Sequence, residues 1–158
     1  MKRIIVTGGA GYIGSHTVRQ LLAAGHQVTV VDNLYSGHRW AVPPTADFHQ
    51  LDAGDEPAMS SLLRQQRSDA VIHFAGHIVV PESIADPAKY YRNNVVASLN
   101  LIRACCASGV RYFIFSSSAA VYGDAEQVPV AETLGQMTEH LRQRRRVFRE
   151  VGGHGVYA

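Results

Sequence analysis

Residues 3–14 read Arg-Ile-Ile-Val-Thr-Gly-Gly-Ala-Gly-Tyr-Ile-Gly, an apolar run followed directly by a glycine-rich turn. The run is rich in β-branched residues and predicts a buried strand over residues 3–7. The next stretch predicts a helix over residues 12–24, because its apolar side chains recur at helical spacing and Gly25 follows as a stop signal. A strand, a glycine turn and a helix in this order are typical of a nucleotide-binding unit.

The same alternation continues along the chain. Further apolar runs predict strands over residues 27–31, 47–51, 70–74 and 111–115, and helical patterns cover residues 56–66 and 90–108. Because such alternation implies right-handed crossovers, we expect an α/β chain with a three-layer, doubly wound parallel sheet. This is the Rossmann fold, here with about five strands in the order 3-2-1-4-5.

Composition excludes several classes of protein. The chain has 158 residues, of which 46% are hydrophobic, and a formal net charge of +2, which fits one globular domain and excludes a disordered or collagen-like chain. Its two cysteines are adjacent, which favours a reducing compartment over a disulfide framework. No apolar run approaches the ~20 residues of a membrane span. We therefore expect a cytoplasmic chain that does not enter a membrane.

Two acidic residues follow predicted strands at the edge where a doubly wound sheet binds ligands. Asp32 lies 18 residues after Gly14, which matches the carboxylate that accepts hydrogen bonds from the adenosine ribose of a bound dinucleotide. That carboxylate would repel a 2′-phosphate, so the pattern favours NAD over NADP. Asp52 follows the third predicted strand and would lie beside the adenine. A glycine-rich turn with solvated loop aspartates is the alternative interpretation.

Several longer motifs resemble the UDP-glucose 4-epimerases of the extended short-chain dehydrogenase/reductase family. They are Thr-Gly-Gly-Ala-Gly-Tyr-Ile-Gly-Ser-His at residues 7–16, Asp-Asn-Leu at 32–34, His-Phe-Ala-Gly at 73–76, Val-Pro-Glu-Ser at 80–83, Tyr-Tyr-Arg-Asn-Asn at 90–94 and Phe-Ser-Ser-Ser-Ala-Ala-Val-Tyr-Gly at 115–123. The related sugar-nucleotide dehydratases carry an Asp-Glu pair where this chain has Ala119-Ala120, which argues against them. The resemblance covers residues 1 to about 133.

The resemblance implies a site for NAD and a UDP-sugar substrate. It assigns the catalytic serine to Ser118, which is also counted among the cofactor contacts. The implied cofactor-binding residues are Gly8, Gly11, Tyr12, Ile13, Gly14, Asp32, Asn33, Leu34, Tyr35, Ser36, Gly37, Asp52, Ala53, Phe74, Ala75, Gly76, His77, Ile78, Asn93 and Ser118. Many epimerases have a lysine where this chain has Ile78. No metal ion is implied.

The resemblance breaks after about residue 133. In these epimerases a Tyr-x-x-x-Lys pair, roughly 25 residues after the serine, takes the proton of the sugar 4-OH while hydride passes to NAD, giving a 4-keto intermediate. Here no tyrosine occurs between Tyr122 and Tyr157, and no lysine follows Lys89. A deletion or a shifted reading frame would explain this. The sequence also spans about half the length of full epimerases, so we expect it not to include their substrate domain.

Residues 134–158 differ in composition from the rest. They hold five arginines and two glutamates, whereas residues 1–133 hold ten basic and eleven acidic side chains. We interpret residues 1–133 as an NAD-binding Rossmann domain and residues 134–158 as a divergent arginine-rich helical tail. A solvated helix face explains these arginines better than a surface for nucleic acid or an anionic membrane. Without the second half of an epimerase, the sheet would expose an edge and an apolar face that this half normally covers. Such exposure predicts dimerisation or aggregation.

Two functions remain open from the sequence. The chain is either part of a UDP-glucose 4-epimerase that is inactive on its own, or a non-catalytic NAD-binding remnant or regulatory module. An assay that detects NAD binding but no epimerisation would distinguish an NAD-binding module from an active epimerase.

Overall fold

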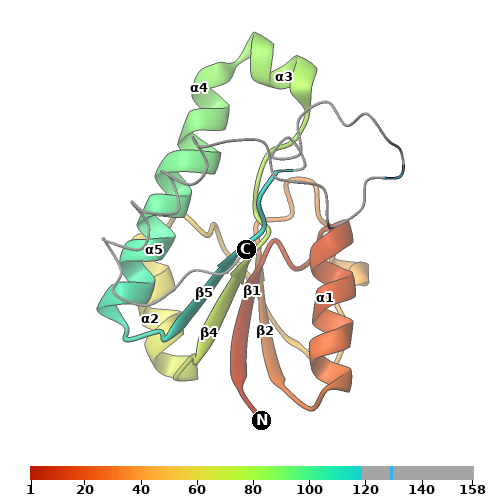
Figure 1. Cartoon of the computed structure of the whole chain (residues 1–158), viewed down its shortest axis with the longest axis vertical. Coiled ribbons are helices and arrows are strands. Elements are labelled where there is room, and N and C mark those ends of the chain that lie inside the picture. Colours follow the sequence, from red (N-terminus) through yellow and green to blue (C-terminus); the bar gives the residue numbers. More distant parts are fainter. Residues whose placement is uncertain (119–128, 130–158) are drawn as a thin grey trace.

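A computed structural model describes residues 1–118 and Pro129. Five parallel strands form one sheet in the order β3-β2-β1-β4-β5, as the sequence predicts (Figure 1). Consecutive residues of β1 pair with consecutive residues of both neighbouring strands. Ile5 of β1, for example, lies opposite Thr29 of β2 on one side and Val71 of β4 on the other. The strands are β1 (Arg3–Thr7), β2 (Gln27–Asp32), β3 (Asp47–Gln50), β4 (Ala70–His73) and β5 (Tyr112–Phe115).

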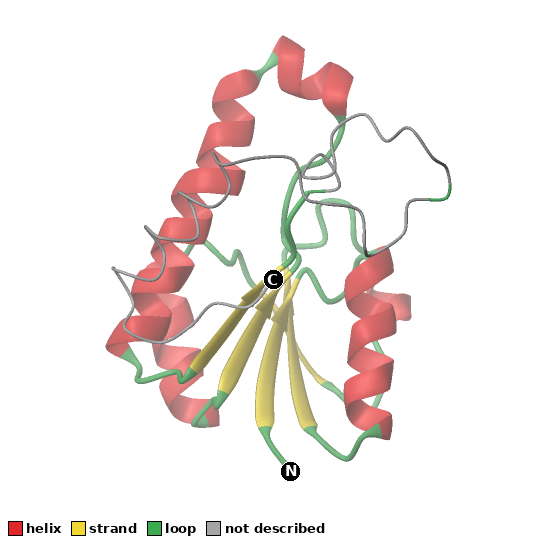
Figure 2. Cartoon of the chain, viewed as in Figure 1, coloured by secondary structure: helices red, strands yellow, loops and turns green. Residues whose placement is uncertain are grey.

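Helices cover both faces of the sheet (Figure 2). Because successive strand side chains point to opposite faces, Ile4 and Val6 of β1 enter one apolar cluster and Ile5 enters the other. The first cluster includes Val18 of α1 (Tyr12–Ala23), and the second includes side chains of α2 (Glu56–Gln66) and α5 (Ser98–Ala107). The result is the expected three-layer sandwich, with the central strands buried on both faces.

The connection between β4 and α5 is longer and more helical than expected. The chain forms α3 (Val80–Ala85) and α4 (Pro87–Tyr90), then a π-helical stretch η2 (Tyr91–Ala97) that runs into α5. The prediction of one helix over residues 90–108 therefore covers only the second part of this arm. Asp86 explains the start of α4, because its side chain accepts a hydrogen bond from Lys89 N. A short 3₁₀ turn, η1 (Arg39–Ala41), was also not predicted.

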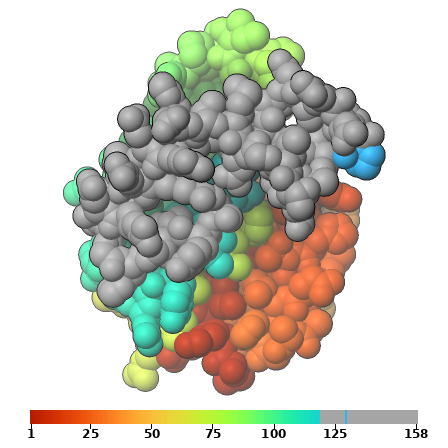
Figure 3. Space-filling model, viewed as in Figure 1, coloured from red at the N-terminus to blue at the C-terminus, as the bar shows by residue number. Residues whose placement is uncertain are grey.

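The α3 and α4 segment projects beyond the sheet and forms one end of the molecule (Figures 1 and 3). No helix in the part of the chain that the structure describes is long and apolar enough to cross a membrane. The predicted tail helix and the expected domain boundary at residue 133 lie outside the described residues.

Candidate functional site

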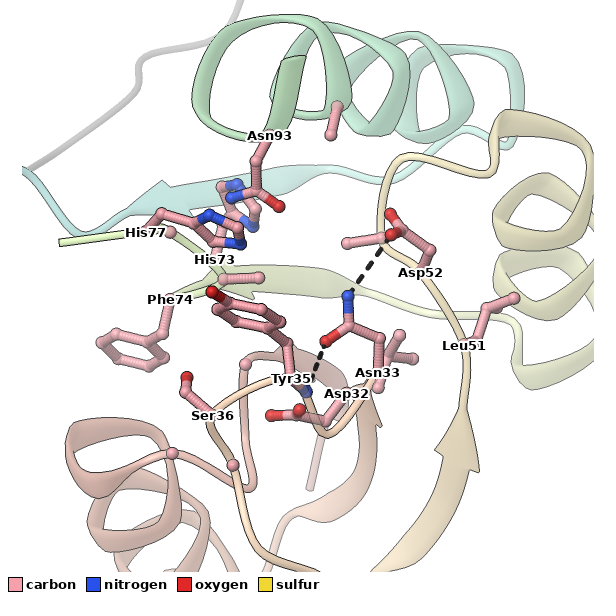
Figure 4. Close-up of a pocket in the computed structure, with 18 residues that line it drawn as sticks. Asp32, Asn33, Tyr35, Ser36, Leu51, Asp52, His73, Phe74, His77 and Asn93 are labelled. Atoms are coloured by element: carbon pink, nitrogen blue, oxygen red, sulfur yellow. Dashed lines mark hydrogen bonds between the residues drawn. The ribbon is translucent and has the colours of Figure 1, made fainter. Parts of the chain in front are cut away.

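A pocket opens at the carboxyl edge of the sheet, where β1, β2 and β4 end (Figure 4). The strand order reverses between β1 and β4, and this switch point is where doubly wound sheets bind ligands. The lining residues are Gly8, Gly11, Val31, Asp32, Asn33, Tyr35, Ser36, Gly37, Leu51, Asp52, Ala53, His73, Phe74, Ala75, Gly76, His77, Asn93 and Ala97.

The glycine turn between β1 and α1 forms the floor of this pocket. Gly8 has a positive φ of 71°, and a Cβ atom built on it would lie 2.6 Å from the backbone nitrogen of Ala75. Only glycine therefore lets the turn after β1 approach the turn after β4 so closely. Gly11 is the N-cap of α1, and this helix start has neither a capping side chain nor an acidic residue in its first turn. Its first N–H groups remain available to an anion.

Asp32 lies at the end of β2, on the other side of the turn. It is only 8% exposed, and its two carboxylate oxygens are held by two different loops. Oδ2 accepts a hydrogen bond from Ala10 N at 2.9 Å, and Oδ1 accepts one from Leu34 N at 2.8 Å. Because a carboxylate has about four acceptor positions, both oxygens can still accept bonds from a ligand.

The loop after β2 reaches across to the loop after β3. Asn33 Nδ2 donates to Asp52 Oδ2 at 3.3 Å, and Asn33 Oδ1 accepts from Tyr35 N at 3.0 Å (Figure 4). Asp52 Oδ1 in turn accepts from Gly54 N at 2.7 Å. The chain passes through Leu34 with a positive φ of 62°, an uncommon conformation for a leucine. These bonds fix a polar side wall on which two carboxylates and one amide face the pocket.

His73 is a buried and neutral part of the pocket. Ser98 Oγ donates its one proton to Asn94 O, so it accepts from His73 Nε2 at 2.9 Å. The other ring nitrogen, Nδ1, then accepts from Thr7 Oγ1 at 2.6 Å. This assigns the Nε2–H tautomer from the hydrogen-bond network. Burial lowers the pKa of His73 to about 4. With both nitrogens occupied, the ring positions β1 against α5.

His77 lines the pocket at its rim. Asn94 holds its backbone, accepting from His77 N at 2.8 Å and donating to His77 O at 2.9 Å. Nδ1 of His77 is buried and has no hydrogen-bond partner in the described part of the protein. Burial, and then the nearby Lys89 cation, lower the pKa of His77, so its ring is neutral near pH 7. It can therefore offer a ligand one donor or one acceptor.

The structure gathers most of the residues that the sequence singled out. The six that do not line the pocket are Tyr12, Ile13, Gly14, Leu34, Ile78 and Ser118. Gly14 is buried in the first turn of α1, where its lack of a side chain lets the helix pack on the glycine turn. Ile78 is 87% exposed, and Ser118 is exposed after β5.

Four lining residues were not among the expected site residues: Val31, Leu51, His73 and Ala97. Val31, Leu51 and His73 lie at or beside strand ends, so their place at the ligand edge follows from the strand pattern. Ala97 had no such signal, because only the packing of η2 brings it to Gly54. Asn94 was also missed as a positioning residue, although it stands beside Asn93 in a motif that the resemblance used.

Comparison with known proteins agrees with this geometry. A model of the NAD dependent epimerase/dehydratase family matches residues 4–145. The chain belongs to the NAD-dependent epimerase/dehydratase family. Among curated members, a UDP-glucose 4-epimerase of Lacticaseibacillus casei is 51% identical over 130 residues, which cover 82% of this chain and 39% of that protein.

Solved structures of this epimerase family share the fold. The UDP-glucose 4-epimerase of Brucella ovis in complex with NAD matches with a TM-score of 0.83 and 36% identity, covering 98% of this chain and 50% of that one. That of Thermotoga maritima with UDP-glucose matches with a TM-score of 0.81 and 33% identity, covering 96% and 52%. The chain thus spans about half the length of these structures, and less of the Lacticaseibacillus relative.

Proposed function

We propose that this chain binds NAD in the pocket at the carboxyl edge and corresponds to the cofactor-binding half of a UDP-glucose 4-epimerase. One observation carries the proposal: the open N-terminus of α1 and the Asp32 carboxylate face the same pocket at the switch point of the sheet. The first group suits a pyrophosphate, and the second suits the two hydroxyls of a ribose.

The residues present fit such a ligand. Gly8 and Gly11 leave the pocket floor without side chains, so a pyrophosphate can approach the backbone N–H groups of α1. Among the described residues, Nδ1 of His77 has no hydrogen-bond partner, so it gives the rim a polar atom that a ligand can engage. Asp32 favours a free 2′-hydroxyl over a 2′-phosphate, and Asp52 supplies an acceptor on the side where the adenine would lie. These groups favour NAD over NADP.

The catalytic part of the proposal concerns the longer protein that the relatives represent. Bound NAD supplies a reversible hydride acceptor for the oxidation of a UDP-sugar. In the pocket, both ring nitrogens of His73 are bonded to Thr7 and Ser98, and Ser98 in turn donates to the backbone oxygen of Asn94, so neither nitrogen faces a substrate. The sequence carries no Tyr-x-x-x-Lys pair after Ser118. We therefore propose that this chain alone binds NAD and does not epimerise UDP-glucose or UDP-galactose.

A non-catalytic NAD-binding module is the second candidate, and the absence of that pair favours it for the chain as it stands. A UDP-sugar is the proposed substrate of the longer protein, because relatives are UDP-glucose 4-epimerases. We also propose a homodimer, since Tyr112 and Ile114 of the edge strand β5 are 49% and 41% exposed.

The proposal is tested by direct titration with the reduced cofactor. The only tryptophan, Trp40, lies in η1, close along the chain to the Asp32 loop, so energy transfer to NADH reports binding. We expect saturable NADH binding, displacement by NAD, weaker displacement by NADP, and no conversion of UDP-galactose. Absence of NADH binding contradicts the cofactor assignment, and conversion of UDP-galactose contradicts the proposed inactivity.

A further inference from the structure

The two rims of the pocket are joined by a cluster of four side chains, of which only Tyr35 is among the expected cofactor contacts. Tyr35 comes from the loop after β2, whereas Glu82, Lys89 and Tyr90 come from α3 and α4, which follow β4. We call these four residues the Tyr35 latch. Because β2 and β4 lie on opposite sides of β1, the latch spans the pocket from one rim to the other.

Glu82 is the centre of the latch and bonds to each of the other three members. The Tyr35 hydroxyl donates to Glu82 Oε1 at 3.0 Å and accepts from Lys89 Nζ at 2.7 Å. Lys89 Nζ also forms an ion pair with Glu82 Oε1. The Tyr90 hydroxyl lies 2.8 Å from Glu82 Oε2 and accepts from Val79 N at 3.0 Å. One carboxylate therefore collects two tyrosines and a lysine, and holds α3 against α4.

The latch also positions an aromatic pair at the mouth of the pocket. The Tyr35 ring stacks on the His77 ring with their centroids 4.6 Å apart and their planes 14° from parallel. Both rings line the pocket (Figure 4). Lys89 Nζ lies 4.6 Å from the centre of the Tyr35 ring, which adds a cation–π contact to the hydrogen bond. His77 is held from the other side by Asn94. The stacked pair is thus fixed to both rims.

The charges of the latch cancel each other, so it adds no net charge at the mouth of the pocket. Glu82 is the one acid in this cluster, and Lys89 neutralises it. The side chains of both are about 30% exposed, at 31% and 29%, so the pair lies at the surface and not in the core. Bonds to Lys89, then to Tyr90, hold the pKa of Glu82 at about 2, so the latch keeps its charges through the neutral range.

We propose that the Tyr35 latch holds the two rims together and thereby slows the exchange of a dinucleotide bound between them. The inference rests on the proposed NAD site and adds to it the residues that control entry and release. A ligand under the Tyr35–His77 pair leaves when the rims part, and parting them breaks the bonds of Tyr35 to Glu82 and Lys89. Loss of the latch should raise both the association and the dissociation rate constants, with a smaller change in their ratio.

The test compares NADH release from matched variants. Tyr35→Phe removes the latch hydroxyl but keeps the ring, and Tyr91→Phe removes an exposed hydroxyl from the same helical arm that takes no part in the latch. Glu82→Gln breaks the ion pair of the latch. Its control is Glu56→Gln, which breaks the ion pair between Glu56, in the first turn of α2, and Arg103 of α5. Each protein is loaded with NADH and mixed rapidly with excess NAD.

We expect Tyr35→Phe and Glu82→Gln to release NADH about two- to tenfold faster than the wild type, as loss of one or two partly exposed hydrogen bonds implies. Tyr91→Phe and Glu56→Gln should release it at the wild-type rate. Equal release rates in all five proteins overturn the latch, as does faster release in the two controls.

A second measurement tests the latch without any cofactor. Hydrogen exchange of the backbone amides at residues 34–37 should rise in Tyr35→Phe and Glu82→Gln and stay unchanged in the two controls. If NADH fails to bind the wild type, the proposed function is wrong, and these exchange rates still decide whether the rims are tied together. Unchanged exchange in both latch variants contradicts the inference.

Discussion

The close approach of the two turns under the pocket predicts a large effect of adding one methyl group at Gly8. Gly8→Ala places a Cβ atom 2.6 Å from Ala75 N and 2.7 Å from the carbonyl carbon of Phe74, which are backbone atoms and cannot rotate away. Gly8 also has a φ of 71°. A left-handed conformation costs a residue with a side chain roughly 1–2 kcal/mol, and overpacking adds roughly 1–3 kcal/mol. Together they lower the free energy of unfolding by about 2–5 kcal/mol.

The chain offers a matched control at Gly25. Its φ is 80°, but no atom of the described residues lies within 4 Å of a Cβ atom built there, so Gly25→Ala carries the conformational cost alone. We expect a loss of roughly 1–2 kcal/mol in that variant. For a chain of this size each kcal/mol lowers Tm by about 2–4 °C. Guanidinium unfolding followed by circular dichroism measures both variants. A Gly8→Ala protein no less stable than Gly25→Ala refutes the packing argument.

Three other predictions follow from single side chains. The native pKa of His73 is about 4, below the value near 6.5 of an unfolded histidine, so the unfolded state binds more protons at low pH. The stability that neutral His73 contributes is therefore complete above pH ~6.5 and is lost as the pH falls toward ~4. We expect His73→Gln to flatten this pH dependence when the free energy of unfolding is measured by chemical unfolding at pH 7.5 and 4.5. Asp32→Asn leaves either Ala10 N or Leu34 N facing an amide NH₂, so the protein without cofactor should lose about 1–3 kcal/mol of stability, whereas equal stability would contradict the structural role of this carboxylate. Alkylation of the native chain should modify the exposed Cys106 and spare Cys105, whose burial raises its pKa to about 12; mass spectrometry after a short pulse decides, and early modification of Cys105 would contradict the packing of α5.

The regular part of the fold follows from local sequence signals. The apolar run at residues 3–7 is buried on both faces and therefore central, and the glycine turn after it requires the helix that follows. Asp32 could be placed in the pocket because its position at a strand end decides which edge of the sheet it reaches. Apart from the helix expected over residues 90–108, the boundaries differ by about one residue, since helix and strand ends depend on individual capping bonds.

The rest depended on contacts distant in sequence. The apolar stretch at residues 78–81, where α3 begins, carries no helical periodicity. The helix forms where Glu82 bonds to Tyr35, Lys89 and Tyr90. His73 read as an ordinary packed strand residue, and only the structure shows that Thr7 and Ser98 occupy both of its nitrogens. Such partners are 66 and 25 residues away along the chain and leave no local pattern.

A thermal-shift titration of the chain with NAD tests the central claim most directly. At a hundredfold excess over Kd, a ligand that binds only the folded state stabilises it by about 2.7 kcal/mol, or roughly 5–10 °C for a chain of this size. We expect a saturable rise of this order with NAD and a smaller one with NADP at the same concentration. A cooperative melt whose midpoint does not move with NAD contradicts the account.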